Sequence, residues 1–109
     1  MHELGLAMQV VEIVSERCAG ARVKKVVLEV GVLAAVLPDA LELCFGLAAE
    51  GTPVEGARLD IVQIPGKARC AACGGEVVLM QALGQCSCGG IELAWTDGFD
   101  LRVREMEVV

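Results

Sequence analysis

The sequence predicts an α+β fold in which two helices pack on a small mixed three-stranded sheet, with a cysteine-rich lobe inserted into it. Three observations lead to this prediction. Apolar residues recur at helical spacing in residues 3–19 and 38–50, and alternate as in strands in 21–30, 58–64 and 99–108. Four cysteines crowd the stretch just before the last strand. With 109 residues, the chain has room for one modest core and a small second lobe.

The two helices are predicted from their apolar stripes and from the residues that bound them. The expected buried stripe of the first helix comprises Leu4, Ala7, Met8, Val11, Val14, Ser15 and Cys18. That of the second comprises Leu41, Cys44, Phe45 and Ala48. Pro38 suits the first turn of the second helix, and Gly20 and Gly51 end the two helices. Cys18 and Cys44 lie in these stripes, so we expect them to be core residues and not ligands.

The strand order follows from the connections between the segments. A helix separates the first two strands, which predicts a right-handed βαβ crossover with parallel pairing. Pro65 and Gly66 are expected to close the second strand. The last strand is expected to return to the same sheet, and its alternation slips by one residue near Arg104 and Glu105, which predicts a β-bulge. Residues 76–80 and 91–94 are candidate short strands of the inserted lobe.

The domain organisation predicted from this pattern has two parts. Residues 1–65 together with 99–109 form the α/β domain, and residues 66–98 form the lobe. The lobe has too few apolar residues to fold by burial alone, so we expect a metal to hold it together.

The cysteines of the lobe form two close pairs, Cys70 with Cys73 and Cys86 with Cys88. Two such pairs on a short arm are typical of a tetrahedral Zn²⁺ site, here in a zinc-ribbon-like lobe, and four protein ligands leave no open position for catalysis. The segment 1–16 contains no lysine or arginine and does not resemble a secretory signal, so we expect a cytoplasmic protein whose thiols stay reduced. A disulfide framework and a CxxC redox site are the competing interpretations. The Cys86-Ser87-Cys88 spacing is one residue shorter than usual.

Composition argues against two classes of partner. The net charge is −6 and aromatic residues make up 3% of the chain, whereas nucleic-acid binding favours a basic face with stacking aromatics. In the hydrophobic half of the chain the longest uncharged stretch, residues 30–38, is far too short to span a membrane.

A second candidate metal site lies at the amino terminus. His2 is the only histidine of the chain and follows the terminal residue directly. The amine of Met1, the backbone nitrogen and imidazole Nδ1 of His2, and the backbone nitrogen of Glu3 could together form a planar four-nitrogen set for Ni²⁺ or Cu²⁺. A terminal histidine with no metal role is the alternative.

The whole chain resembles the HypA/HybF family of hydrogenase and urease nickel-incorporation proteins. The resemblance rests on the opening Met1-His2-Glu3-Leu4, the segments 26–31, 33–37 and 41–45, the two cysteine pairs, and the closing segment 98–108. It departs from the family at Cys86-Ser87-Cys88, where two residues usually separate the cysteines.

The resemblance implies a nickel metallochaperone that carries Ni²⁺ at its amino terminus to the large subunit of a nickel–iron hydrogenase, or in some members to urease. It implies that a nickel-handling GTPase takes part. By position, His2 would be the nickel ligand, with the amine of Met1 and the backbone nitrogen of Glu3. Cys70, Cys73, Cys86 and Cys88 would bind structural zinc.

Three hypotheses follow, from different classes. The first is metal delivery without catalysis, because one terminal histidine provides no nucleophile–base pair. The second is a zinc-ribbon adaptor that docks other proteins and has no nickel role. The third is a thiol redox enzyme that uses Cys70 and Cys73.

Overall fold

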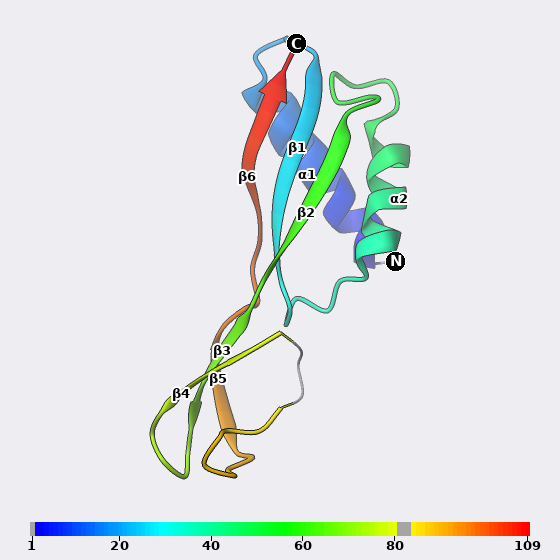
Figure 1. Cartoon of the computed structure of the whole chain (residues 1–109). Coiled ribbons are helices and arrows are strands. Elements are labelled where there is room, and N and C mark those ends of the chain that lie inside the picture. Colours follow the sequence, from blue (N-terminus) through cyan, green and yellow to red (C-terminus); the bar gives the residue numbers. More distant parts are fainter. Residues whose placement is uncertain (1, 81–83) are drawn as a thin grey trace. The chain divides into compact units, whose positions relative to one another are not determined.

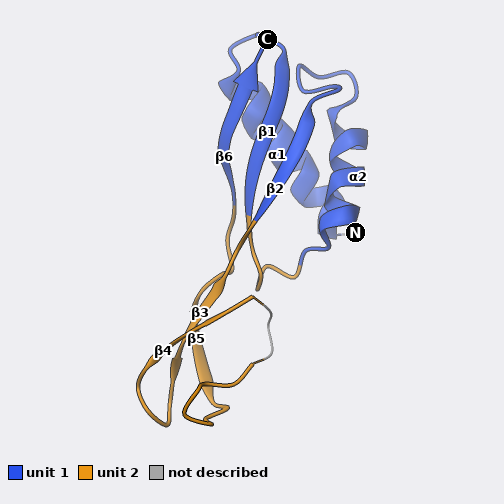
Figure 2. Ribbon diagram, in the orientation of Figure 1, with its two compact units in different colours: residues 1–29, 36–62, 102–109 blue, residues 30–35, 63–101 orange. Residues whose placement is uncertain are grey.

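A computed structural model describes residues 2–80 and 84–109 of the chain (Figure 1). In chain order its elements are α1 (His2–Arg17), β1 (Val23–Gly31), α2 (Pro38–Ala49), β2 (Arg58–Ile64), β3 (Gly66–Cys70), β4 (Glu76–Leu79), β5 (Leu93–Asp97) and β6 (Leu101–Val108). The chain divides into two compact units (Figure 2). The helix unit contains residues 1–29, 36–62 and 102–109, and the cysteine unit contains residues 30–35 and 63–101.

The three-stranded sheet has the order β2-β1-β6, and both helices cover one of its faces (Figure 1). β6 runs antiparallel to β1, because Val109 N–H donates to Arg22 O at one end of β1 while Gly31 N–H donates to Asp100 O at the other. β1 and β2 run in the same direction, with α2 connecting them (Figure 1). The mixed sheet, the parallel pair and the return of the last strand are therefore confirmed.

The core of the helix unit lies between the helices and the sheet. Its buried side chains include Ala7, Val10, Val11, Val14 and Cys18 from α1 and the turn after it, Val26, Leu28 and Val30 from β1, and Leu41, Cys44, Phe45 and Ala49 from α2. The core positions of Cys18 and Cys44 are confirmed. The prediction for Met8 was wrong, since its side chain is 58% exposed, and Val10 is buried instead. The buried arc of α1 is centred on Ala7 and Val14, which places Met8 at its margin.

Ion pairs cover the outer face of this sheet and reveal the slip in β6. Lys25 and Glu29 lie four residues apart in β1 and so point to the same face. Glu29 contacts Arg102 at 2.8 Å and Arg104 at 4.0 Å, whereas Lys25 contacts Glu107 at 3.2 Å. Arg104 and Glu107 are three residues apart, and a regular strand would point them to opposite faces. The predicted one-residue slip is confirmed.

The cysteine unit contains the second sheet, which is antiparallel and has the order β4-β3-β5. β2 ends at Ile64 and Pro65 lies outside any strand, so the predicted end of the second strand is confirmed. The central strand of the second sheet, β3, begins directly after Pro65 at Gly66 and was not predicted. β4 matches the predicted strand, whereas β5 starts two residues later than predicted and ends at Asp97. The buried cluster comprises Cys70, Val77 and Cys86, with Leu79 and Leu93 packed against it. Within the described residues, no helix is long and apolar enough to cross a membrane.

Candidate metal centres

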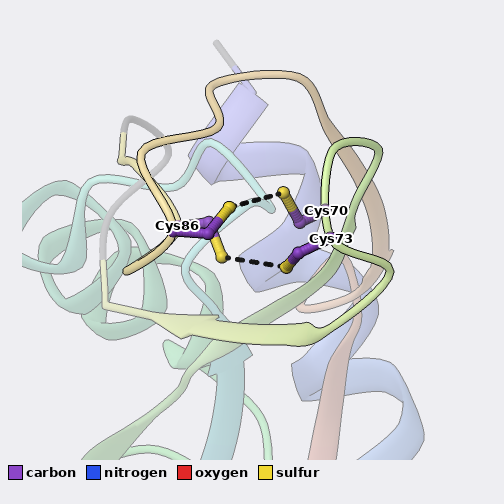
Figure 3. A group of neighbouring side chains, drawn as sticks. Cys70, Cys73 and Cys86 are labelled. Carbon is purple, nitrogen blue, oxygen red and sulfur yellow. Dashed lines mark hydrogen bonds between the residues drawn. The ribbon is translucent and has the colours of Figure 1, made fainter.

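The four cysteines of the cysteine unit converge on one point. Their Sγ atoms all lie within 4.8 Å of one another, and the pairs Cys70–Cys88 and Cys73–Cys86 are each 3.6 Å apart (Figure 3). A tetrahedral zinc ion with Zn–S bonds of 2.3 Å separates its sulfurs by about 3.8 Å. The two close pairs are near this spacing, so the four-cysteine cluster fits zinc. It brings together the four cysteines that the sequence singled out.

Each pair of cysteines sits in a tight turn with the same plan. In the first turn, Gly74 N–H donates to Cys70 O, and Gly74 has a φ of 72°. In the second, Gly89 N–H donates to Cys86 O, and Gly89 has a φ of 95°. A positive φ favours glycine at both positions.

The second turn closes over one residue fewer than the first. Its hydrogen bond runs back three residues, from Gly89 to Cys86, whereas that of the first turn runs back four, from Gly74 to Cys70. The short Cys86-Ser87-Cys88 spacing is thus accommodated by a tighter turn, which still directs both sulfurs to the common point. The departure from the usual spacing does not remove a ligand from the site.

Backbone amides support the two exposed sulfurs. Gly75 N–H donates to Cys73 Sγ and Gly90 N–H donates to Cys88 Sγ, both at 3.4 Å. Such bonds stabilise negative charge on a thiolate ligand. A Cβ at position 90 would lie 2.7 Å from Cys70 Sγ, so glycine is required there by the close approach of the ligand itself.

Two polar side chains, neither of them predicted from the sequence, hold the turns through hydrogen bonds to backbone carbonyls. Arg69 donates to Gly74 O at 2.7 Å, and Gln85 donates to Gly89 O at 2.8 Å. Each residue directly precedes the first cysteine of its pair. Their shared position was the available signal, but neither residue type is a zinc ligand and nothing else in the sequence indicates the contact.

The two thiols of the second turn, Cys86 and Cys88, have pKa values shifted in opposite directions. The pKa of Cys86 is lowered to about 7, first by the backbone N–H of Cys88 and then by the thiols of Cys88 and Cys73. The Gly90 N–H lowers the pKa of Cys88, but the neighbouring thiols of Cys86, Cys70 and Cys73 outweigh it and raise that pKa to about 12. Cys86 and Cys88 therefore share protons as a pair, and Cys86 is the one that ionises more readily. A cation at the centre of the four sulfurs would favour the thiolate forms.

The amino-terminal residues lie at the start of α1. His2 is the first residue of the helix and its side chain is exposed, whereas Met1 lies outside the described residues. The first four N–H groups of a helix have no helical acceptor, so the amides of His2 and Glu3 are not engaged in helical hydrogen bonds. No other group of three or more His, Cys, Asp or Glu side chains converges within residues 2–80 and 84–109, apart from the four cysteines.

Glu3 connects the starts of the two helices. Its carboxylate accepts a hydrogen bond of 3.3 Å from Leu37 N–H, directly before α2. The pKa of Glu3 is lowered, first by its own backbone N–H and then by that of Leu37. The charged form of Glu3 therefore ties the amino-terminal end of α1 to α2.

The fold and these sites are those of a class of small metal-binding protein, with a convergent four-cysteine cluster and an exposed histidine at a helix start. The family model of HypA, described as hydrogenase/urease nickel incorporation, metallochaperone, matches residues 1–108. The chain belongs to this family of nickel metallochaperones for hydrogenase maturation.

Named relatives support the same conclusion. The hydrogenase maturation factor HypA of Nostoc punctiforme is 44% identical over 108 residues, covering 99% of this chain and 96% of the relative. That of Trichormus variabilis is 45% identical over 108 residues with the same coverage.

Two solved structures share the fold. The solution structure of the Ni metallochaperone HypA from Helicobacter pylori has a TM-score of 0.61 at 21% identity, covering 97% of this chain and 93% of that one. A second solution structure, of HypA protein, has a TM-score of 0.60 at 22% identity, covering 97% of this chain and 92% of that one. The predicted fold class and family are confirmed.

Proposed function

We propose that this chain binds Ni²⁺ at its amino terminus and delivers it to the large subunit of a nickel–iron hydrogenase during maturation. Membership of the nickel-incorporation family over residues 1–108 supports this proposal. Residues 1–65 with 99–109 form the nickel-binding domain, and residues 66–98 form the zinc lobe. The chain acts as a carrier and not as an enzyme.

The observation that carries the proposal is the position of His2 at the exposed start of α1. Its imidazole and the backbone nitrogens of His2 and Glu3 are close in the chain, and recruiting those nitrogens breaks no helical hydrogen bond. With the terminal amine of Met1 they supply four nitrogens, a set that suits square-planar Ni²⁺. An exposed chelate can be dismantled one ligand at a time, as delivery requires.

The four-cysteine cluster takes a different role in this proposal. Its geometry suits resident zinc, and four thiolates leave no position for water or substrate. We assign Cys70, Cys73, Cys86 and Cys88 as structural zinc ligands. Zinc would hold β3, β4 and β5 together and would not be transferred.

The partners in this proposal are proteins of the same maturation process. They are a nickel-handling GTPase, the hydrogenase large subunit and, in organisms that use it, urease maturation proteins, all in the cytoplasm. The acidic balance of the chain, −6, disfavours nucleic acid as a partner.

Calorimetric nickel titration of the zinc-loaded chain tests the proposal. We compare the native chain, His2→Ala, a form extended by a few residues before Met1, and Gln9→Ala as a control at another exposed position of α1. The native and control chains should bind about one nickel ion each, and the other two should bind at least tenfold more weakly. Zinc content should be the same in all four.

Equal nickel affinity in all four chains would contradict the proposal and favour the adaptor hypothesis. Reversible oxidation of Cys70 and Cys73 with catalytic turnover would instead favour the redox hypothesis.

A further inference from the structure

Helix α2 is apolar on more than one side. Of its twelve residues only Asp39 and Glu42 are polar. One side packs into the core through Leu41, Cys44, Phe45 and Ala49. Yet Leu43 and Leu47 remain 68% and 58% exposed. A surface helix normally carries polar residues on its outer side, so this outer side is unusual.

The exposed leucines form a continuous stripe. Ala40, Leu43 and Leu47 follow the spacing i, i+3, i+7, which places them on one face of the helix. Beside them, a Cβ built at Gly46 would meet no heavy atom within 4 Å, so the helix surface there is unobstructed. We call Ala40, Leu43 and Leu47 the outer stripe.

The surroundings of the outer stripe are acidic. α2 and the segment that follows it, residues 38–57, contain no lysine or arginine, whereas they contain four acidic residues, Asp39, Glu42, Glu50 and Glu55. No ion pair among the described residues involves any of these four carboxylates. Two copies of this face would bring like charges together, which disfavours a homodimer through the outer stripe. A complementary partner must be basic around an apolar centre.

The outer stripe begins at the same end of the helix unit as the amino-terminal residues. Leu37, which directly precedes α2, donates its N–H to the Glu3 carboxylate at 3.3 Å. Leu37 itself is 67% exposed, so it extends the apolar surface toward α1. Figure 1 shows the starts of α1 and α2 at the same end of the helix unit, so a protein seated on the outer stripe would lie close to the start of α1.

We propose that the outer stripe is the docking site for a helix of a partner protein that presents an apolar ridge flanked by lysine and arginine. The docked helix holds that partner beside the amino-terminal metal site, a use that rests on the proposed function. A specific interface of ordinary size covers about 800 Å² on each partner, with an apolar centre and a polar rim. The leucines supply the centre, and Asp39, Glu42 and Glu50 supply an acidic rim that steers a basic partner.

Binding measurements with two purified probes test the proposal. The probes are the nickel-handling GTPase and the hydrogenase large subunit of the same organism, each titrated with the full zinc-loaded chain. The test variant is Leu43→Gln with Leu47→Gln, and Met8→Gln on α1 and Val78→Gln on β4 are controls with similar exposure. All four side chains are exposed, so melting temperature and zinc content should not change.

The expected result is that at least one probe binds the leucine double variant tenfold more weakly or worse, while both controls bind as the native chain does. Glu42→Gln with Glu50→Gln should lower the association rate and the salt dependence of binding. Nickel affinity should be unchanged throughout, which separates this test from that of the metal site.

Three outcomes would overturn the proposal. Both probes could bind the double variant as tightly as the native chain. A second outcome is that neither probe binds the native chain. This result would also contradict the partners of the proposed function, but not its nickel site. The chain could form a dimer that the double variant abolishes, and the occupant would then be a second copy.

Discussion

The four-cysteine cluster and the amino-terminal end of α1 differ in how completely the fold builds a metal site. In the cluster, two glycine turns, two amide–sulfur bonds and two side-chain clasps fix four sulfurs at zinc spacing. At the start of α1, the side chain of His2 is exposed, the first amides have no helical acceptor, and the Glu3 carboxylate accepts hydrogen bonds from its own backbone N–H and from Leu37 N–H. This difference agrees with the proposed function, in which a resident ion occupies a prebuilt cage and a cargo ion is held by ligands that can leave.

The largest effect is expected from the loss of a buried zinc ligand. Cys70→Ser should abolish stoichiometric zinc binding, because it removes one of the four ligands. The cysteine unit should then lose its fold, since structural zinc contributes on the order of 10 kcal/mol and the buried cluster around Cys70 is small. Amide resonances of β3, β4 and β5 should lose their dispersion, as NMR spectra would show. Cys44→Ala, which removes a buried thiol outside the cluster, should retain zinc.

Retention of full zinc content and of dispersed β3 resonances in Cys70→Ser would contradict the assignment of zinc as the main support of the lobe. Nickel binding should persist in this variant if the two regions are independent.

A smaller effect is expected when an added side chain crowds the cysteine cluster and all four sulfurs remain. Gly90→Ala places a Cβ 2.7 Å from Cys70 Sγ and 3.1 Å from the Ala72 Cβ, so the sulfur must move. We expect zinc affinity to fall about tenfold, measured by competition with a chromophoric chelator. Gly46→Ala is the control, since nothing lies within 4 Å of the added carbon. It should leave zinc affinity unchanged and stabilise α2 by up to about 1 kcal/mol.

Zinc affinity that is equal in Gly90→Ala and the native chain would show that the cage is more adaptable than its glycine turns indicate. The contrast with the amino-terminal end would then weaken.

The smallest effect is expected from removing the charge of Glu3, whose carboxylate links the starts of α1 and α2. The pKa of Glu3 is lowered in the folded chain, so its charged form contributes stability at neutral pH, and this contribution is lost as pH falls through the folded pKa. Glu3→Gln should therefore lower Tm slightly at pH 7. The difference from the native chain should vanish in acid, below the ordinary carboxyl range. Glu12→Gln, at another exposed position of α1, is the control.

A Tm difference between Glu3→Gln and the native chain that stays constant from neutral to acidic pH would show that the charge of Glu3 does not hold the helix starts together.

The features that the sequence predicted are those with a local signal. Apolar spacing located both helices, and the phase slip near Arg104 was visible in the alternation of the last strand. Cysteine spacing alone identified the four side chains that converge, because few other structures need two such pairs. Resemblance identified the family, which spacing could not do.

The features that escaped prediction depend on tertiary context. β3 reads Gly-Lys-Ala-Arg-Cys, with no strongly strand-forming residue, and it becomes a strand because β4 and β5 pair with it on both sides. Met8 and Val10 are both apolar, and only the placement of α1 on its neighbours decides which one is buried. The hydrogen bonds from Arg69 and Gln85 to the turn carbonyls likewise depend on the folded turns and could not be predicted from the sequence.

X-ray absorption at the nickel edge tests the central claim most directly. The chain would be loaded with one zinc and one nickel ion. We expect a planar nickel shell of four nitrogen ligands without sulfur, which changes in His2→Ala while the zinc shell keeps four sulfurs. Nickel–sulfur scattering in the native chain, or an identical nickel shell in His2→Ala, would contradict the central claim.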